Sequence, residues 1–186
     1  MRIIGGRSRG LHLSPVGAGD AAAHLRPTSD RVREAIFNLL INGGYGDPVT
    51  GARVLDLFAG TGALGLEALS RGAARVCFVD DGPVSLGLLR RNIGLMRAEG
   101  NVDVLRRDAT RLGAVRGEPF DLVFLDPPYG KGLGAAALGS AQAGGWLASD
   151  ALVVWEERVA PAAPPGFDPL DQRKYGDTVV TLLRLA

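Results

Sequence analysis

The segment between residues 54 and 65 constrains this chain of 186 residues most strongly. The apolar run 54–57 predicts a buried strand, and the small residues after it predict a tight turn that leads into a helix. Glycines at positions 60, 62 and 65 have the spacing of a turn that brings the backbone close to a ligand. A strand, a glycine turn and a helix in this order indicate an α/β fold that binds its ligand at the end of the sheet.

From residue 52 onward, apolar runs and helical patterns alternate along the chain. Such alternation predicts a mostly parallel sheet with helices on both faces. Prolines between residues 161 and 169 exclude a helix there, so we expect the last strand to belong to an antiparallel pair at one sheet edge. The predicted strands are 52–57, 76–79, 102–106, 121–125, 151–156 and 179–185, and the predicted helices are 63–71, 83–97 and 132–143.

The residues ahead of this alternation carry a different pattern. Two short extended stretches, 2–4 and 11–13, are punctuated by glycines and predict a small β-hairpin arm. A helix is expected to begin near residues 28–30, which offer three possible N-caps. We therefore divide the chain into an arm with its loop, residues 1–24, and one α/β domain, residues 25–186.

Size and composition exclude several classes of protein. A chain of this length buries roughly 70% of its unfolded surface, so it needs no disulfide or structural metal. The single cysteine, Cys77, lies in an apolar run and is expected to be a core residue rather than a nucleophile. With one cysteine, no signal peptide and no apolar run of the length of a membrane span, we expect a cytoplasmic protein.

A second motif, Asp126-Pro127-Pro128-Tyr129, follows the predicted strand 121–125 directly. The strand places Asp126 at the carboxyl end of the sheet, and the prolines fix the backbone with carbonyls that lack helical or sheet partners. A carboxylate, a carbonyl and an aromatic ring on one rigid turn suit a planar group that carries an NH2, such as a nucleobase. The simpler interpretation is a strand that ends at proline, with Asp126 as an N-cap.

The glycine turn alone fits NAD as well as other adenosine cofactors. Asp80, about 20 residues after Gly60, is placed to accept hydrogen bonds from ribose hydroxyls. Asp56 favours a ligand that carries an ammonium group, because a pyrophosphate would be repelled by its charge. The Asp-Pro-Pro-Tyr motif has no role in hydride transfer, so an NAD-linked oxidoreductase leaves both Asp56 and this motif unexplained.

Asp56 to Gly62 and Asp126 to Tyr129 resemble the cofactor and catalytic loops of S-adenosylmethionine-dependent amino-methyltransferases. Segments 2–6, 26–34, 62–73 and 175–178 resemble one family in particular, the bacterial RsmD-type 16S rRNA guanine-N2 methyltransferases. The resemblance covers nearly the whole chain. It implies a Rossmann-like class I methyltransferase fold with a seven-stranded, mostly parallel sheet and a small N-terminal β-hairpin arm. One departure is Asp80, where the family more often has Glu, although the shorter acid is still expected to reach the ribose.

The resemblance also implies roles for individual residues, with S-adenosyl-L-methionine as the cofactor. Asp108 would accept a hydrogen bond from the adenine amino group, and it is equally an N-cap candidate for the segment after it. The residues with a catalytic role would be Asp126, Pro127, Pro128 and Tyr129. The residues that hold the cofactor would be Thr28, Asp56, Phe58, Ala59, Gly60, Thr61, Gly62, Asp80, Asp81, Asp108 and Ala109.

Positive charge is concentrated near the N-terminus. The net charge is +1, but residues 1–34 hold six arginines against three carboxylates, an excess of three. Arginine suits bidentate contact with phosphate, although a general bias toward arginine is the alternative explanation. We expect a monomer whose partner is 16S rRNA, within a small-subunit particle, without metal or membrane. The expected RNA contacts are Arg2, Arg7, Arg9, Arg26, Arg31 and Lys174.

Two other functions fit parts of the sequence. The Asp-Pro-Pro-Tyr motif suits the amine of adenine equally well, which would make the protein an adenine-N6 DNA methyltransferase. Such enzymes usually carry an additional target-recognition domain, for which this chain has no room. A non-catalytic RNA-binding module with a vestigial pocket is the other alternative, and cofactor binding distinguishes it from an enzyme.

Overall fold

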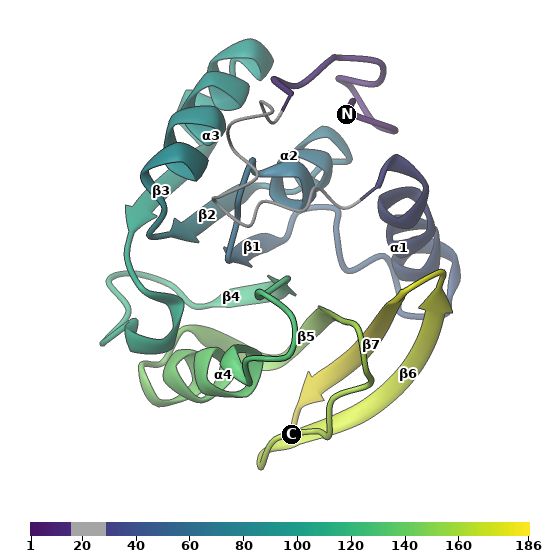
Figure 1. Cartoon of the computed structure of the whole chain (residues 1–186), viewed down its shortest axis with the longest axis vertical. Coiled ribbons are helices and arrows are strands. Elements are labelled where there is room, and N and C mark those ends of the chain that lie inside the picture. The colour runs from purple at the N-terminus through teal and green to yellow at the C-terminus, as the bar shows by residue number, and fades with distance from the viewer. Residues whose placement is uncertain (16–28) are drawn as a thin grey trace.

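The computed structural model describes residues 1–15 and 29–186 and contains one seven-stranded sheet, in the order β3-β2-β1-β4-β5-β7-β6. Strands β1 to β5 run parallel, and β7 pairs antiparallel with both β5 and β6 (Figure 1). The strands are β1 Arg53–Leu57, β2 Arg75–Asp80, β3 Val102–Arg106, β4 Phe120–Leu125, β5 Leu147–Glu157, β6 Phe167–Tyr175 and β7 Thr178–Leu185. The α-helices are α1 Asp30–Asn42, α2 Ala63–Ser70, α3 Pro83–Met96 and α4 Leu133–Ala143, and the short 3-10 turns are η2 Glu99–Asn101 and η3 Ala109–Arg111.

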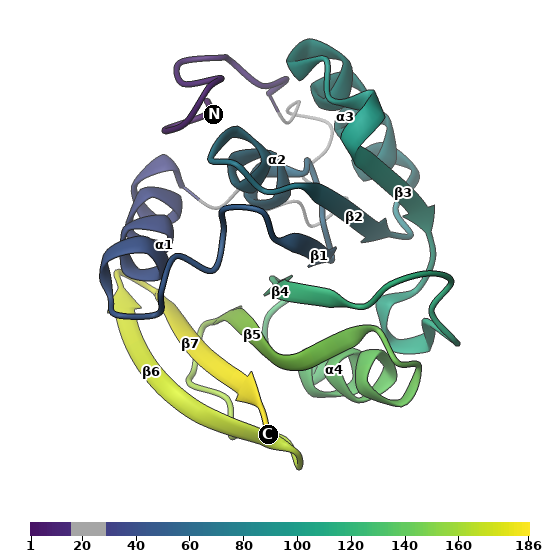
Figure 2. The same cartoon turned by 180° about the vertical axis from the view of Figure 1, so that it is seen from behind.

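Helices cover both faces of the sheet, as Figures 1 and 2 show from opposite sides. Alternate residues of each strand point to opposite faces, and this alternation divides the core into two clusters. The first contains Val54, Phe78 and Phe124 and packs against α1, α2 and α3. The second contains Leu55, Val79 and Val123 and packs against α4. The predicted fold, a mostly parallel sheet between two helical layers, is therefore confirmed.

Most predicted elements match the structure to within a few residues. Ser29 caps α1 through its hydroxyl, which accepts a hydrogen bond from the Val32 amide at 3.2 Å. Cys77 is a buried residue of β2, and burial raises the pKa of its thiol to about 12. Strand β5 is longer than predicted, since it begins at Leu147.

Strand β6 was not among the predicted strands, although the antiparallel pair that it forms with β7 was expected. Pro169 lies within this strand and weakened the strand signal. The proline is tolerated because β6 is the last strand of the sheet and the pairing shifts between Pro169 and Asp171. An edge strand offers one side that needs no hydrogen-bond partner in the sheet.

The N-terminal arm, residues 1–15, is docked on α2. An isolated antiparallel bridge joins Arg2 to His12, so the arm is a hairpin with minimal pairing. The arm is packed against the core, because Ile3 and Leu13 are buried in the same cluster as α1 and α2. Gly6 approaches α2 so closely that a Cβ atom there would lie 1.9 Å from the Ser70 carbonyl oxygen.

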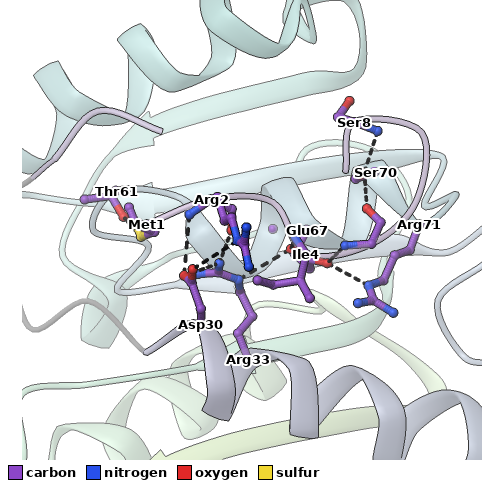
Figure 3. A network of polar contacts seen from close by, with 12 residues as sticks. Met1, Arg2, Ile4, Ser8, Asp30, Arg33, Thr61, Glu67, Ser70 and Arg71 are labelled. Atoms are coloured by element: carbon purple, nitrogen blue, oxygen red, sulfur yellow. Dashed lines mark hydrogen bonds and ion pairs between the residues drawn. The ribbon is translucent and has the colours of Figure 1, made fainter. Parts of the chain in front are cut away.

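A buried carboxylate holds the arm in place (Figure 3). Glu67 is fully buried in α2, and its oxygens accept hydrogen bonds from the amides of Ile4 and Gly5, both at 2.8 Å. Arg71 donates to the same carboxylate at 2.8 Å, and Arg33 forms an ion pair with it at 3.4 Å. Arg33 is itself fully buried, so one of the six N-terminal arginines belongs to the interior and cannot contribute to a basic surface.

Within residues 1–15 and 29–186, no helix is both long and apolar enough to cross a membrane. No group of three or more His, Cys, Asp or Glu side chains within these ranges is arranged to hold a metal ion.

Candidate active site

The predicted site residues follow four neighbouring strands and meet at one edge of the sheet. Parallel strands β3, β2, β1 and β4 are adjacent, so their carboxyl ends lie side by side. Asp108 follows β3, Asp80 ends β2, Phe58 follows β1 and Asp126 follows β4. These four residues therefore lie in one line along the edge of the sheet. The line contains both sequence motifs, which are more than 60 residues apart in the chain.

The glycine turn, residues 58–62 between β1 and α2, is held by side chains from three elements. The Asp80 carboxylate accepts from the Gly60 amide at 2.8 Å, and Asn92 of α3 donates to the Thr61 carbonyl at 2.9 Å. The Asp56 carboxylate accepts from the Gly65 amide at 2.9 Å in the first turn of α2. These contacts fix the turn before any ligand is present.

Two backbone features set the shape of this turn. Phe58 has a φ of 59°, which is strained for a residue with a side chain, and such outliers concentrate at functional sites. Gly65 lets α2 pack closely on β2, because a Cβ atom there would lie 2.4 Å from the Phe78 ring. The third glycine of the motif thus serves helix packing, and the first two serve the turn itself.

Asp56 is a carboxylate with 2% of its surface exposed. Burial raises the pKa of Asp56 well above its usual value, and the nearby Asp126 and Asp80 raise it further, whereas the Gly65 amide lowers it. A cation beside this carboxylate would relieve both the burial cost and the repulsion. The environment therefore suits the ammonium group that the sequence predicts.

A small cavity lies beside the glycine turn. Its walls include five of the predicted cofactor residues, Phe58, Asp80, Asp81, Asp108 and Ala109, together with Val79 and Arg107. Asp108 also caps η3, since its carboxylate accepts from the Thr110 amide at 2.8 Å and from the Thr110 hydroxyl at 2.7 Å. These bonds, led by the one from the hydroxyl, lower the pKa of Asp108, so it remains an acceptor. An aromatic ring and three carboxylates suit a nucleoside better than a polyphosphate.

Two residues of this cavity, Asp80 and Arg107, also make hydrogen bonds that support the local backbone. One carboxylate oxygen of Asp80 accepts from the Gly60 amide and the other accepts from the Gly82 amide, both at 2.8 Å. Asp80 therefore shapes the turn as well as lining the cavity. Burial raises the pKa of Asp80, although these two amides lower it in part. Arg107 also lines the cavity, and it donates to the Leu112 carbonyl.

The Asp-Pro-Pro-Tyr loop, residues 126–129, leaves β4 at the same edge. Pro127 is buried, whereas Asp126, Pro128 and Tyr129 are half-buried. The Tyr129 hydroxyl lies 3.4 Å from the Thr178 hydroxyl at the start of β7. Burial raises the pKa of Tyr129 to about 12, and the charges of nearby carboxylates add to this effect. The ring therefore stays neutral and is available for stacking.

Sequence reasoning missed two carboxylates beside this loop. Glu156 is 2% exposed, and the pairing of Leu125 with Trp155 puts it next to Asp126. Glu157 accepts from the Gly130 amide at 3.2 Å and so anchors the end of the loop. Glu156 ends an apolar run of β5, as Asp126 ends one of β4, and this shared pattern is the signal that could have revealed it.

The described residues among the predicted RNA contacts come from the arm, α1 and β6. Arg2, Arg7 and Arg9 are exposed on the arm, and Arg2 is paired with Asp30 at 3.8 Å. Arg31 is exposed on α1, and Lys174 is exposed near the end of β6. Arg26, together with the predicted cofactor residue Thr28 and the boundary at residue 24, lies outside the described residues.

Comparison with known proteins gives consistent results. The model of a family described as conserved hypothetical protein 95 matches residues 1–184. The chain is 42% identical over 165 residues to ribosomal RNA small subunit methyltransferase D of Escherichia coli strain K12, covering 88% of this chain and 78% of that protein. It is 42% identical over 132 residues to the putative rRNA methyltransferase YlbH of Bacillus subtilis strain 168, covering 69% and 67%.

A solved structure is similar over the whole chain. It is described as putative methyltransferase yhhF from Escherichia coli, with a TM-score of 0.82 and 37% sequence identity. The similarity covers 100% of this chain and 97% of that one. The aligned region thus spans the N-terminal arm as well as the sheet.

Proposed function

The chain belongs to the conserved hypothetical protein 95 family, and from that premise we propose that it transfers a methyl group to the N2 amine of a guanine in 16S rRNA. It is a methyltransferase and therefore uses a methyl donor. The observation that carries the proposal is the placement of the glycine turn and the Asp-Pro-Pro-Tyr loop on adjacent strands β1 and β4. This arrangement puts a cofactor-binding turn beside a loop suited to a nucleobase amine.

S-adenosylmethionine is the donor that fits these residues. Asp56 suits the ammonium of its methionine part, Asp80 and Asp81 suit the ribose hydroxyls, and Asp108 suits the adenine amine. Phe58 and Ala109 supply apolar walls to the same cavity. The clustering of carboxylates favours this ligand over one with phosphates, since phosphate groups would be repelled.

The chain's own residues act mainly by alignment. Asp126 and the Pro127 carbonyl accept the two N–H bonds of the guanine amine, which directs the nitrogen lone pair toward the donor, while Tyr129 stacks on the base. The sulfonium donor supplies a methyl group that is already activated for transfer. One N–C bond forms, one S–C bond breaks, and the amine loses a proton toward Asp126 or water. No metal and no covalent intermediate is required.

The base must leave its stacked position in the RNA to reach this loop. The half-buried ring of Tyr129, held near Thr178, offers a surface on which an extruded base can stack. The exposed arginines of the arm, together with Arg31 and Lys174, are proposed to contact phosphates around it. The RNA is proposed to be part of a small-subunit particle, and the protein is proposed to act in the cytoplasm as a monomer.

The direct test measures transfer of a labelled methyl group to small-subunit particles from a strain that lacks the modification. Naked 16S rRNA and duplex DNA serve as competing substrates. We expect labelled N2-methylguanine in 16S rRNA and none in DNA, with the modified nucleotide mapped by digestion and mass spectrometry. Labelled N6-methyladenine in DNA would instead support the adenine-N6 alternative. Donor binding without transfer to any substrate would support the non-catalytic module.

A further inference from the structure

Asn92 of α3 is fully buried, and its side-chain amide joins two segments that are remote in the sequence. Its Nδ2 donates to the Thr61 carbonyl oxygen at 2.9 Å, within the glycine turn. Its Oδ1 accepts from the Ser14 amide at 2.7 Å, at the end of the N-terminal arm. One side chain therefore connects the arm to the turn.

The hydrogen bond from Asn92 to Thr61 restrains one peptide group at its carbonyl side. That peptide group consists of the Thr61 carbonyl and the Gly62 amide, and the Gly62 amide donates to the Ala59 carbonyl at 2.7 Å. Gly60 and Gly62 have φ values of 56° and 80°, which glycine adopts readily, along with several alternatives. Without Asn92, only the Gly62 amide would hold this peptide group, so the orientation of the group depends in part on Asn92.

The other end of the arm meets the same residue. The Met1 sulfur lies 3.8 Å from the Thr61 hydroxyl, and the Met1 carbonyl accepts from the Leu13 amide at 3.1 Å (Figure 3). Met1 and Ser14, the two ends of the hairpin, thus converge on the glycine turn. Glu67 fixes the middle of the arm separately, so the contacts at Thr61 are not required for docking the whole arm.

We propose that Asn92 is a positioning residue for the methyl donor, which acts by fixing the Thr61–Gly62 peptide in the orientation that the donor contacts. The inference rests on the proposed function, because it takes the glycine turn as the donor site. Both ends of the Asn92 amide are engaged, by Ser14 and by Thr61, so Asn92 acts on the donor through Thr61. The two hydrogen-bond partners of Asn92 belong to the arm and to the glycine turn, and not to the Asp-Pro-Pro-Tyr loop. Loss of the Asn92 amide should therefore weaken donor binding and spare the chemical step.

Mutations can test the two hydrogen bonds of the Asn92 amide separately. Asn92→Asp keeps an oxygen that accepts from Ser14 but places a second oxygen against the Thr61 carbonyl. Ser14→Pro removes the arm's N–H donor and leaves the bond to Thr61 intact. Asn101→Asp is the matched control, since Asn101 is exposed and its amide donates to Ala74 at 3.2 Å, away from the turn.

The experiment measures three quantities for each variant: the Kd of S-adenosylmethionine by calorimetry, the donor KM with kcat on RNA, and the melting temperature. For Asn92→Asp we expect the donor Kd and KM to rise about tenfold, the effect of one unsatisfied buried acceptor, with kcat at saturating donor within about twofold of wild type. Asn101→Asp and Ser14→Pro should keep the donor Kd within about twofold. Asn92→Ala, which removes both bonds without adding charge, should repeat the tenfold rise if Asn92→Asp fails to fold.

A wild-type donor Kd in a folded Asn92 variant would overturn the proposal, even if its melting temperature fell, because Asn92 would then be purely structural. An equal loss of donor affinity in Ser14→Pro would also overturn it, since arm docking rather than the Thr61 contact would then set the turn. Failure of the proposed function looks different. In that case the wild-type protein itself would fail to bind the donor, or would bind it without transferring methyl groups.

Discussion

The glycine turn and the Asp-Pro-Pro-Tyr loop leave adjacent strands, yet they are held very differently. In the turn, Asp80 accepts from the Gly60 amide at 2.8 Å and Asn92 donates to the Thr61 carbonyl at 2.9 Å, and Asp56 accepts from Gly65 in the first turn of α2 at 2.9 Å. Two contacts at the loop are longer, at 3.4 Å between Tyr129 and Thr178 and at 3.2 Å between Gly130 and Glu157. We infer that the donor half of the site is preformed, whereas the acceptor half is completed by the substrate. Preorganisation on one side lowers the entropic cost of alignment, and looseness on the other admits an extruded base.

The largest expected effect comes from Asp126. Asp126→Ala should lower turnover by at least about 100-fold, because the amine loses its charged acceptor in the transition state. The Kd of S-adenosylmethionine, measured by calorimetry, should stay close to the wild-type value. Asp126→Asn should retain part of the activity, since an amide oxygen still accepts a hydrogen bond. Equal losses of donor affinity and rate would instead assign Asp126 to the donor half.

Asp80 tests the donor half. Asp80→Ala removes a proposed ribose contact and also the acceptor of the Gly60 and Gly82 amides. Donor binding should weaken by about 1.5–3 kcal/mol, the range for hydrogen bonds to a charged group. Calorimetry measures the change directly, and kcat at saturating donor should fall much less. An unchanged Kd would show that neither the carboxylate nor the shape that it gives the turn matters for the donor.

Substitutions of the arm arginines should disturb neither the donor half nor the acceptor half of the site. Replacing Arg2, Arg7 and Arg9 by Ala should weaken rRNA binding and reduce the slope of log affinity against log salt by at most about 2–3 units, roughly one per lost phosphate contact. Donor affinity should not change, because Glu67 and Asn92 hold the arm through its backbone amides, which these substitutions keep. The matched control replaces the exposed Arg90, Arg91 and Arg116. A wild-type slope in the arm variant would move the RNA surface elsewhere, first to Lys131 and Lys174.

Asp56 predicts a pH dependence. Its folded pKa is raised above the usual 3.8, so the folded state binds the proton more tightly than the unfolded state. Its contribution to stability is therefore full below pH 3.8 and is lost as the pH rises through the raised value. Relative to Asp56→Asn, wild type should lose unfolding free energy as the pH increases over this window, as urea denaturation at several pH values would measure. A parallel pH profile for the two proteins would mean that Asp56 titrates normally.

The smallest effect is expected for Thr178. Its 3.4 Å contact with Tyr129 is long for a hydrogen bond between hydroxyls, so Thr178→Val should cost less than about 1 kcal/mol in kcat/KM for RNA. The donor Kd should be unaffected. A loss as large as that of Asp126→Ala would mean that Thr178 fixes the Tyr129 ring before the base arrives, which contradicts a loosely held loop.

The sequence predicted the parallel strands and both motifs because their signals are local. Strand 102–106 was predicted with its observed bounds, and Asp126 was placed correctly at a strand end. Strand β6 escaped detection because Pro169 lies within it, which only an edge strand tolerates. The burial of Arg33 also escaped detection, because its partner Glu67 is 34 positions away and no local pattern links them. Asn92 is missed for the same reason, as both of its partners come from other segments.

Hydrogen exchange of backbone amides tests the difference between the two halves most directly. In the free protein, the Gly60 and Gly62 amides should already be protected, because Asp80 and Ala59 accept from them. The Gly130 amide should exchange rapidly and become protected only when rRNA is added together with S-adenosylmethionine. If Gly130 were as protected as Gly62 in the free protein, the acceptor half would be preformed as well. If the donor alone protected Gly130, the donor rather than the RNA would complete the acceptor half. Either result would show that the inferred division is wrong.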